Sequence, residues 1–290
     1  MEQNLLIEIG LPISLIIIMA GMGLTLTMRD FRQVLLYPRA MIIGSLAQVA
    51  VLPLLAFVLV WLLRLPPALA VGLVVIAACP GGTMSNVLTF LGRGNVALSI
   101  IVTVIASFVT IISLPMFTNL ALDLYVARDI EAPVRLPLVD TIITLFVVIL
   151  LPVLAGMLVR ARKPWLADRA ERFVGLFGVV VLAVLVALIV WQTRTEIVTL
   201  LVLAGPAAVV LNVVGIALGF AASRVFGINA RDALTLAIEL GIKNGTIGLM
   251  VTLTLLDSYE MAIPSAVYGV LMFAFGAGLV VYGRRATAPS

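Results

Sequence analysis

The chain has 290 residues, of which 63% are hydrophobic and 11% are charged, and its formal net charge is +4. A soluble domain needs more charge to cover its core, so this composition excludes an ordinary soluble enzyme or binding module. Histidine is absent and Cys79 is the single cysteine, which excludes an internal disulfide and argues against a thiolate metal site. The small positive charge does not indicate a nucleic-acid partner, because basic residues in a membrane protein first report its topology.

Long apolar runs recur from end to end of the chain. Each holds about 20 residues, enough to cross a hydrocarbon layer of about 30 Å as a helix. We therefore predict an all-α polytopic membrane protein that forms a single transmembrane unit over residues 1–290. The nine predicted spans are 5–27, 40–63, 67–91, 95–122, 137–159, 173–191, 197–223, 232–256 and 261–283. The longest predicted connections are 123–136 and 160–172. The opening MEQNLLIEIG has neither the basic region nor the cleavage site of a removable signal peptide.

The basic residues of the connections predict the orientation of the spans. With the N-terminus outside, thirteen arginines and lysines fall in inner connections, whereas the outer connections hold Arg64, Arg128, Arg135 and Arg194. Lys243 alone falls within a span. Because the inner loops of membrane proteins are enriched in arginine and lysine, this bias predicts an N-out, C-in topology. We expect a multi-pass protein of a cell membrane, specifically a bacterial inner membrane.

Two spans contain helix-breaking residues at membrane depth. The segment IAACPGGTMSNVLTFLGRGN, residues 76–95, has Pro-Gly-Gly in its middle, and ELGIKNGTIG, residues 239–248, has three glycines around Asn244. Proline removes a helical hydrogen bond and glycine weakens a helix, and non-helical backbone is tolerated at this depth only inside protein or beside a wet cavity. Opposed broken helices in the two halves of a chain are typical of inverted-repeat transporters. The alternative is a pair of kinked but continuous helices.

The motifs CPGGTMSNVLTFLGRGNVALS at 79–99 and ELGIKNG at 239–245 resemble those of the bile acid:sodium symporter family. The resemblance implies a core domain with two crossing discontinuous helices and a smaller panel domain. The panel would comprise about 1–30 and 137–191, and the core about 38–122 and 197–283. Many bacterial members have two inverted repeats of five helices. By that resemblance this chain begins at their second helix, which would account for nine spans and an outside N-terminus.

The same resemblance implies a first sodium site behind the crossing. Its oxygen-bearing residues would be Ser85, Asn86, Ser99, Thr103 and Glu239. Ser99 and Thr103 are four residues apart and so share one helix face, as ligands of a hard cation should. For Ser85 and Asn86 the alternative is ordinary hydrogen bonding between helices.

A second sodium site in the family uses the same carboxylate, two backbone carbonyls and two glutamines. The matching residues here are Gln48, Glu239, Leu240, Ile242 and Lys243. Lys243 replaces one glutamine, and an ammonium has donors but no acceptor for sodium. At 4 Å and an effective dielectric of about 20, its charge would repel the ion by roughly 4 kcal/mol. Gln48 is expected to contact Lys243 or Glu239, the alternative being a solitary polar contact.

The sequence leaves three roles open for Lys243. As a fixed charge one helical turn after Glu239, it would take the place of the second sodium, so that transport uses one sodium or none. As a proton carrier it would lose and regain a proton, which burial favours and the nearby carboxylate opposes. As a structural ion-pair partner it would leave sodium coupling otherwise normal.

The family's substrates are typically organic anions, either bile-acid-like or small carboxylates. The resemblance places Thr83 and Asn244 in the substrate cavity, with Met272 and Phe273 on a wall that carries polar residues in some members. No arginine is predicted within a span to receive a carboxylate. We therefore expect a secondary transporter of organic anions, with some preference for amphipathic or mostly apolar ones.

Other classes of protein are less well supported. A Ser85–Lys243 dyad of an intramembrane hydrolase is conceivable because a desolvated lysine can act as a base, but Glu239 would keep that lysine charged. A channel needs a continuous polar lining, and the polar residues here cluster at one crossing. We expect no enzyme activity, no catalytic residue, and no cofactor or metal apart from sodium at one site. The expected partners are a small organic anion and the lipid bilayer, with no nucleic acid and no required protein. Cys79 is expected to be a packing residue.

Overall fold

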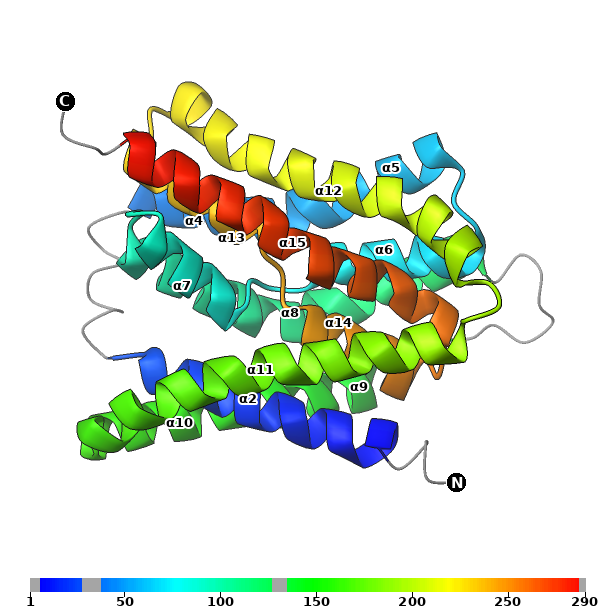
Figure 1. The fold of residues 1–290 in the computed structure, drawn as a ribbon, viewed down its shortest axis with the longest axis horizontal. Helices are drawn as coiled ribbons and strands as arrows, with labels where there is room; N and C mark the ends of the chain where they lie inside the picture. Colours follow the sequence, from blue (N-terminus) through cyan, green and yellow to red (C-terminus); the bar gives the residue numbers. More distant parts are fainter. Residues whose placement is uncertain (1–5, 28–37, 127–134, 287–290) are drawn as a thin grey trace.

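The computed structural model describes residues 6–27, 38–126 and 135–286 (Figure 1). These residues contain helices and no β-strand, apart from an isolated bridge between Gly81 and Lys243. In the described part of the chain, six helices are long and apolar enough to cross a membrane: Ile7–Thr25, Pro38–Leu63, Val96–Tyr125, Leu138–Arg162, Ile197–Phe226 and Tyr259–Ala286. The chain is a multi-pass helical membrane protein, as predicted.

Most of the predicted spans are single helices, and several contain a short π-helical turn. They are η1 (Leu6–Gly10) with α2 (Leu11–Thr25); α4 (Pro38–Leu46), η3 (Ala47–Val51) and α5 (Leu52–Leu63); α8 (Val96–Tyr125); α9 (Leu138–Leu145), η4 (Phe146–Leu150) and α10 (Leu151–Arg162); α11 (Pro164–Gln192); α12 (Ile197–Phe226); and α15 (Tyr259–Ala286). The predicted boundaries agree with these bounds to within a few residues, except between α10 and α11.

The connection predicted at 160–172 is wrong. α10 ends at Arg162 and α11 begins at Pro164, so Lys163 alone separates the two helices. The segment resembles a loop because charged residues end the apolar pattern. Proline is nevertheless favourable in the first turn of a helix, and charged side chains beyond the apolar part of a helix can remain in water. The apolar part of α11, Leu176–Gln192, matches the predicted span.

The two interrupted spans are broken, as predicted. The first comprises α6 (Pro67–Ala78) and α7 (Thr83–Leu91), and the second comprises α13 (Ala230–Gly241) and α14 (Gly245–Met250), which continues as η5 (Val251–Leu255). α6 ends because Cys79 precedes a proline, which favours the extended backbone that Cys79 adopts. α14 begins at a cap, since the Asn244 side chain accepts a hydrogen bond from Ile247 N at 3.2 Å.

The two breaks meet inside the bundle and satisfy each other's backbone groups. Asn244 N donates to the Pro80 carbonyl at 2.8 Å, and Gly81 pairs with Lys243 as an antiparallel bridge. In Figure 1 the linker between α6 and α7 crosses the linker between α13 and α14. A bilayer core offers no water to bond exposed backbone, so this pairing allows both helices to break at membrane depth.

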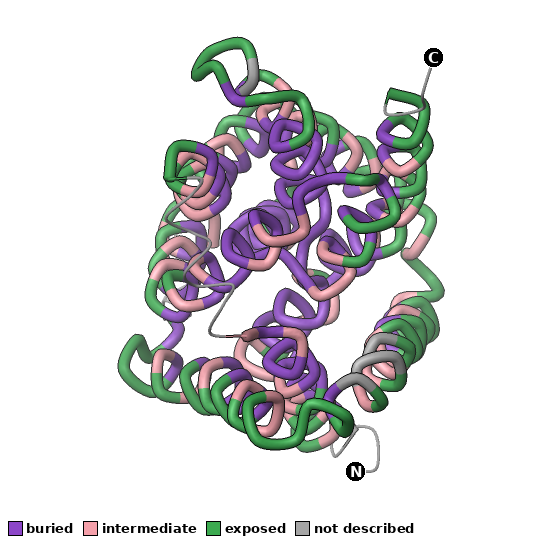
Figure 2. The backbone as a smooth tube through the Cα atoms, turned by 90° about the vertical axis from the view of Figure 1, so that its left-hand side faces the viewer, coloured by how far each residue is buried: buried purple, intermediate pink, exposed green. Residues whose placement is uncertain are grey.

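The helices form two groups. α2 packs against α10 and α11 along one edge of the molecule, and α12 packs with α13 and α15 in a larger group that includes α6 and α8 (Figure 1). Buried backbone is concentrated inside the larger group (Figure 2). α2 and α10 approach closely at Gly23 and Gly156, where a Cβ on either glycine would lie 2.1 Å from a backbone carbonyl oxygen. Small residues at such points let membrane helices pack tightly.

The α7–α8, α10–α11 and α12–α13 connections and the end of α15 lie together at one end of the bundle (Figure 1). We call this the arginine-rich end, because Arg93, Arg162 and Arg231 lie in or beside these connections. The first turn of α2 lies at the opposite end. Arg29, Arg32 and Arg128, which also entered the predicted charge bias, lie outside the described residues.

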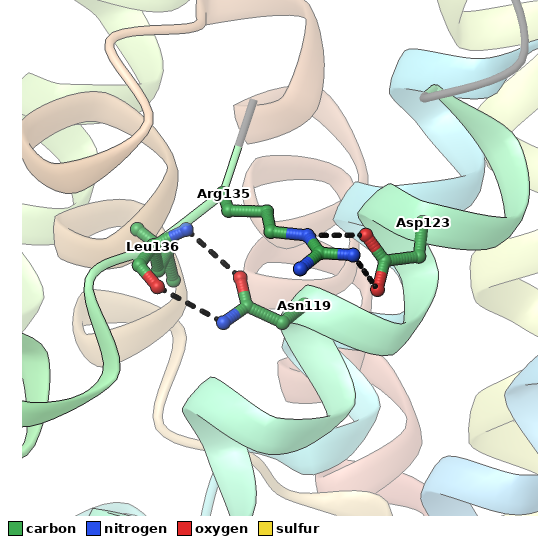
Figure 3. Close-up of polar contacts among 4 residues, drawn as sticks. All are labelled: Asn119, Asp123, Arg135 and Leu136. Carbon is green, nitrogen blue, oxygen red and sulfur yellow. Dashed lines mark hydrogen bonds and ion pairs between the residues drawn. The ribbon is translucent and has the colours of Figure 1, made fainter. Parts of the chain in front are cut away.

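Two side chains of α8 hold the segment that precedes α9 (Figure 3). The Asn119 amide oxygen accepts a hydrogen bond from Leu136 N at 2.8 Å, and its nitrogen donates to the Leu136 carbonyl at 3.0 Å. The Arg135 guanidinium makes two contacts with Asp123, at 2.8 and 3.1 Å. Asn119 thus supplies the backbone bonds that a residue outside any helix lacks.

Asn119→Ala is expected to destabilise the protein more than Asp123→Ala. The first change removes two partly buried hydrogen bonds and should lower the free energy of unfolding by about 1–3 kcal/mol. The second removes an exposed ion pair, which contributes about 0–1 kcal/mol. Thermal unfolding of the purified variants in detergent compares the two. Equal losses of Tm would show that the Asn119 bonds contribute no more than the ion pair.

Candidate functional site

Glu239 is a fully buried carboxylate near the end of α13. Its Oε2 accepts a hydrogen bond from Thr103 Oγ1 at 2.6 Å, and its Oε1 accepts one from Ser99 Oγ. Ser99 and Thr103 lie one turn apart on α8, as their spacing predicts. Within the described part of the chain no basic side chain makes an ion pair with this carboxylate. A buried charge held only by neutral hydroxyls is costly, so the arrangement favours a nearby cation.

Ser85 and Asn86, the other predicted members of the first sodium site, lie in the first turn of α7 beside the same carboxylate. Ser99 Oγ donates to Asn86 Oδ1 at 2.8 Å. Ser85 faces Glu239 and donates its hydroxyl hydrogen to the Gly82 carbonyl at 2.7 Å. The structure thus brings all five predicted residues together. Oxygen atoms around one carboxylate are the donor set that suits a hard cation such as sodium.

Gln48 lies in η3, a π-helical turn of the kind often found at functional sites. It is fully buried, and neither atom of its amide has a hydrogen-bond partner among the described residues. A Cβ built on Gly81 would lie 2.6 Å from Glu239 Oε2, 3.2 Å from Thr103 Oγ1 and 3.3 Å from Gln48 Nε2. Gln48 is therefore adjacent to the carboxylate, and its unbonded amide oxygen fits a site that receives a cation.

Lys243 is as deeply buried as Glu239 but does not pair with it. The prediction that the two lie one turn apart on a helix is wrong, because α13 ends at Gly241 and Lys243 lies in the break. Its ammonium instead donates to the Cys79 carbonyl, with 3.1 Å between Nζ and O. That carbonyl follows the C-terminal end of α6, where the helix dipole is negative. The Cys79 side chain itself packs in the hydrophobic core.

The sequence did not predict which residues donate hydrogen bonds to the last backbone carbonyl of α13. Asn212 of α12 donates its side-chain amide to the Gly241 carbonyl at 2.8 Å, and Tyr268 of α15 donates its hydroxyl to the same oxygen at 2.9 Å. Both side chains are fully buried. The predicted carbonyl ligands flank this position: the Leu240 carbonyl lies against Gly215 of α12, and Ile242 is buried in the break. A lone asparagine within an apolar span was the available signal.

Two adjoining cavities lie between the two helix groups. The smaller, about 40 Å³, is at the crossing and is lined by the four predicted substrate residues: Thr83, Asn244, Met272 and Phe273. Lys243 also lines it. The larger cavity, about 420 Å³, extends toward the arginine-rich end and shares Thr83 and Met84 with the smaller one. Asn86 lines the larger cavity while its amide contacts Ser99, so the candidate ion and substrate sites adjoin.

The sequence predicted no arginine within a span to receive an anionic group. Arg160, in the last turn of α10, lines the larger cavity. We expected it in an inner connection because the predicted span ended at residue 159, whereas α10 continues to Arg162. A basic residue directly after an apolar run was its only sign in the sequence.

The contacts define a class of protein. Ser85 and Lys243 each bond a different backbone carbonyl, so they do not form the dyad of a hydrolase. Two broken helices that cross beside a buried carboxylate, with a cavity between two helix groups, are the architecture of secondary transporters.

Comparison with known proteins identifies the family. Residues 12–200 match the model of the sodium bile acid symporter family. The chain is 33% identical over 269 residues to the uncharacterized sodium-dependent transporter YocS of Bacillus subtilis, covering 93% of this chain and 81% of that protein. It is 28% identical over 236 residues to the human ileal sodium/bile acid cotransporter, covering 81% and 66%. The chain belongs to the sodium bile acid symporter family.

Plant relatives are longer than this chain. It is 32% identical over 273 residues to the probable sodium/metabolite cotransporter BASS1 of Arabidopsis thaliana and 33% identical over 258 residues to BASS1 of rice. The alignments cover 94% and 89% of this chain but 66% and 62% of the plant proteins. These relatives are named as transporters or cotransporters rather than enzymes.

Gly81→Ala is expected to disrupt the candidate ion site. The added Cβ would lie 2.6 Å from Glu239 Oε2, so the carboxylate or the broken backbone must move. We expect a loss of about 1–3 kcal/mol in the free energy of unfolding. Gly278→Ala in α15 is the matched control, because nothing lies within 4 Å of its added Cβ. A Gly81→Ala protein with the Tm of the control would contradict the packing of Glu239 against Gly81.

Proposed function

We propose that the chain is a secondary transporter of organic anions that works by alternating access. It would cross the membrane nine times, with the N-terminus outside and the C-terminus inside. The group containing α2, α10 and α11 would be the panel, over about 1–30 and 137–191. The larger group would be the core, over about 38–122 and 197–283. The proposal rests on one observation: a buried carboxylate, its hydroxyl partners and a cavity meet at the crossing of two broken helices.

Asn86 supports coupling between the ion and the substrate. Its side chain contacts Ser99 in the candidate ion site and also lines the larger cavity. A sodium ion that draws on the Asn86 oxygen would fix the position of this part of the cavity wall. A substrate that contacts the same wall would in turn favour the ion-bound arrangement, because coupling between two binding sites is reciprocal.

We further propose that Lys243 takes the place of the second sodium ion, so that transport is sodium-independent or uses fewer sodium ions. Three features support this role. The ammonium is bound by a backbone carbonyl, as a cation would be. It has no lone pair to offer a sodium ion. Within the described part of the chain it makes no ion pair with Glu239, so the carboxylate stays available to one sodium ion. One sodium ion at the Ser85, Asn86, Ser99, Thr103 and Glu239 site remains compatible with these features.

Two alternatives give different expectations. A conventional symporter would bind its second sodium ion near Gln48 despite the neighbouring ammonium. A proton-coupled carrier would release a proton from Lys243, which requires the ammonium to leave the Cys79 carbonyl during the cycle. Sodium and pH therefore separate the three mechanisms.

Sodium is expected to stabilise the wild type as a one-site ligand and the Lys243→Gln variant more strongly. Glutamine restores an oxygen ligand and removes the repelling charge. Each site adds RT ln(1 + [Na⁺]/Kd), which is about 2.7 kcal/mol at one hundred times Kd. The measurement is Tm in sodium chloride against choline chloride at equal ionic strength. Lys163→Gln, in the exposed α10–α11 connection, is the control and should match the wild type.

The outcomes are distinct. Equal sodium responses of the wild type and Lys243→Gln would contradict the replacement of sodium by Lys243. A wild-type Tm that is indifferent to sodium but changes near neutral pH, with the change abolished in Lys243→Gln, would support the proton-coupled carrier. A two-site sodium response of the wild type would support the conventional symporter.

A further inference from the structure

We propose that Asp232 and Asn95 are positioning residues for the candidate sodium site. They join the first turn of α13 to the start of α8, the two helices that carry the carboxylate of the site and two of its hydroxyls. In this way they fix the register in which these groups meet. The inference rests on the one-sodium form of the proposed function and adds residues that do not themselves touch the ion.

Asp232 is a buried carboxylate, 3% exposed, in the first turn of α13. It accepts hydrogen bonds from two side-chain amides, that of Asn95 at 2.8 Å and that of Asn229 at 2.7 Å. Within the described part of the chain it makes no ion pair. An ionised carboxylate only accepts hydrogen bonds, so it turns both amide nitrogens toward itself. Both amide oxygens therefore point to other donors.

Each of the two amide oxygens caps a helix. Asn95 precedes α8 and accepts a hydrogen bond from Leu98 N at 3.2 Å, and Asn229 precedes α13 and accepts one from Asp232 N at 2.9 Å. A side-chain oxygen at this position stabilises the start of a helix, and a negative charge near it is favourable. Asp232 thus bonds the caps of two helices at once.

Thr235 makes a second contact between the same two helices. Its hydroxyl oxygen accepts a hydrogen bond from Asn95 N at 2.7 Å, and the hydroxyl donates to the Arg231 carbonyl at 3.0 Å. A Cβ on Gly94 would lie 2.8 Å from this oxygen, so the backbone before α8 rests directly on α13. We call Asn95, Asn229, Asp232 and Thr235 the Asp232 cluster. Its bonds oppose sliding of one helix along the other.

The Asp232 cluster lies about two helical turns from the candidate ion site. Glu239 is seven residues after Asp232 on α13, and Thr103 is eight residues after Asn95 on α8. These separations correspond to rises of about 10 and 12 Å. Both helices begin at the arginine-rich end and pack against each other (Figure 1), so the two groups reach similar depths.

The register of the two helices decides whether these groups can bond. A shift of α8 by one residue would move Thr103 about 1.5 Å along the helix axis and turn it by about 100° around that axis. Such a shift would break its 2.6 Å bond with Glu239 Oε2 and separate the oxygen atoms that surround the ion. The Asp232 cluster therefore acts on sodium through the geometry of Ser99, Thr103 and Glu239.

The alternative is that the Asp232 cluster only stabilises two helix ends. Its loss would then lower the stability of the protein and leave the affinity for sodium unchanged. Asn119→Ala is the matched control, because it removes two hydrogen bonds near the opposite end of the same helix, α8. It should lower Tm in choline chloride without changing the dissociation constant of sodium.

The test exchanges the two bonded groups in the full chain in detergent. Asp232→Asn places an amide against an amide, and Asn95→Asp places a carboxylate against a carboxylate, so each single variant loses the bond between the helices. The double variant restores a carboxylate–amide pair. We expect the Kd of radioactive sodium to rise about tenfold or more in each single variant. In the double variant it should return to within about threefold of the wild type, because the two positions are coupled.

Thr235 supplies a second pair of variants that does not alter charge. Thr235→Val removes the acceptor of Asn95 N and should raise the Kd of sodium, whereas Thr235→Ser keeps the hydroxyl and should bind sodium like the wild type. Equal values in these two variants would contradict the positioning role, including the case in which the exchanged variants fail to fold.

The outcomes separate this inference from the proposed function. Wild-type sodium affinity in both single exchange variants, or no recovery in the double variant, would overturn the positioning role and leave the ion site intact. A wild type that does not bind sodium would overturn the ion site and the positioning role together. Changes of Tm in choline chloride, measured on the same samples, report stability separately.

Discussion

The pairing of the two helix breaks is the constraint on which the site depends. Inside a bilayer, each broken helix leaves backbone groups that water cannot reach. Here the breaks bond each other, through Asn244 N and the Pro80 carbonyl and through the bridge between Gly81 and Lys243. This contact brings Glu239, before the second break, next to Ser85, after the first break, and Asn86 lies beside them through its bond with Ser99. It also requires glycine at position 81, because Glu239 and Gln48 occupy the space that a side chain would need.

Each of the two half-helices that end at the crossing leaves a backbone carbonyl that needs a hydrogen-bond donor. The two carbonyls receive chemically different donors. The carbonyl after α6, at Cys79, is bonded by the ammonium of Lys243. The last carbonyl of α13, at Gly241, is bonded by two neutral donors, Asn212 and Tyr268. A neutral cap is indifferent to nearby ions, whereas a charged cap responds to every charge that enters or leaves the site. The end of α13 is therefore held by neutral groups, whereas the end of α6 is coupled electrostatically to the ion site through Lys243.

Properties that depend on short-range sequence pattern could be predicted. The apolar runs predicted the spans, Pro-Gly-Gly predicted the first break, and the spacing of Ser99 and Thr103 predicted their shared face on α8. The direction of Lys243 could not be predicted in this way, since helical spacing fails once the helix ends. Arg160 was missed for a related reason: hydropathy locates the end of an apolar run, but only the packing of α10 shows which of its terminal arginines faces the cavity.

The proposed role of Lys243 changes the charge that the core carries across the membrane. With a glutamine at this position, the empty site has the negative charge of Glu239, and two sodium ions make it positive by one charge. With Lys243 the empty site is neutral, and one sodium ion gives the same positive charge. A monoanionic substrate would neutralise the loaded site in both cases. Moving one charge through the membrane potential involves about 2.3 kcal/mol per 100 mV. Return of the empty carrier would therefore depend on the membrane potential with glutamine at position 243 and be independent of it with lysine. The lysine would thus remove the contribution of the membrane potential to this step, as well as one sodium ion.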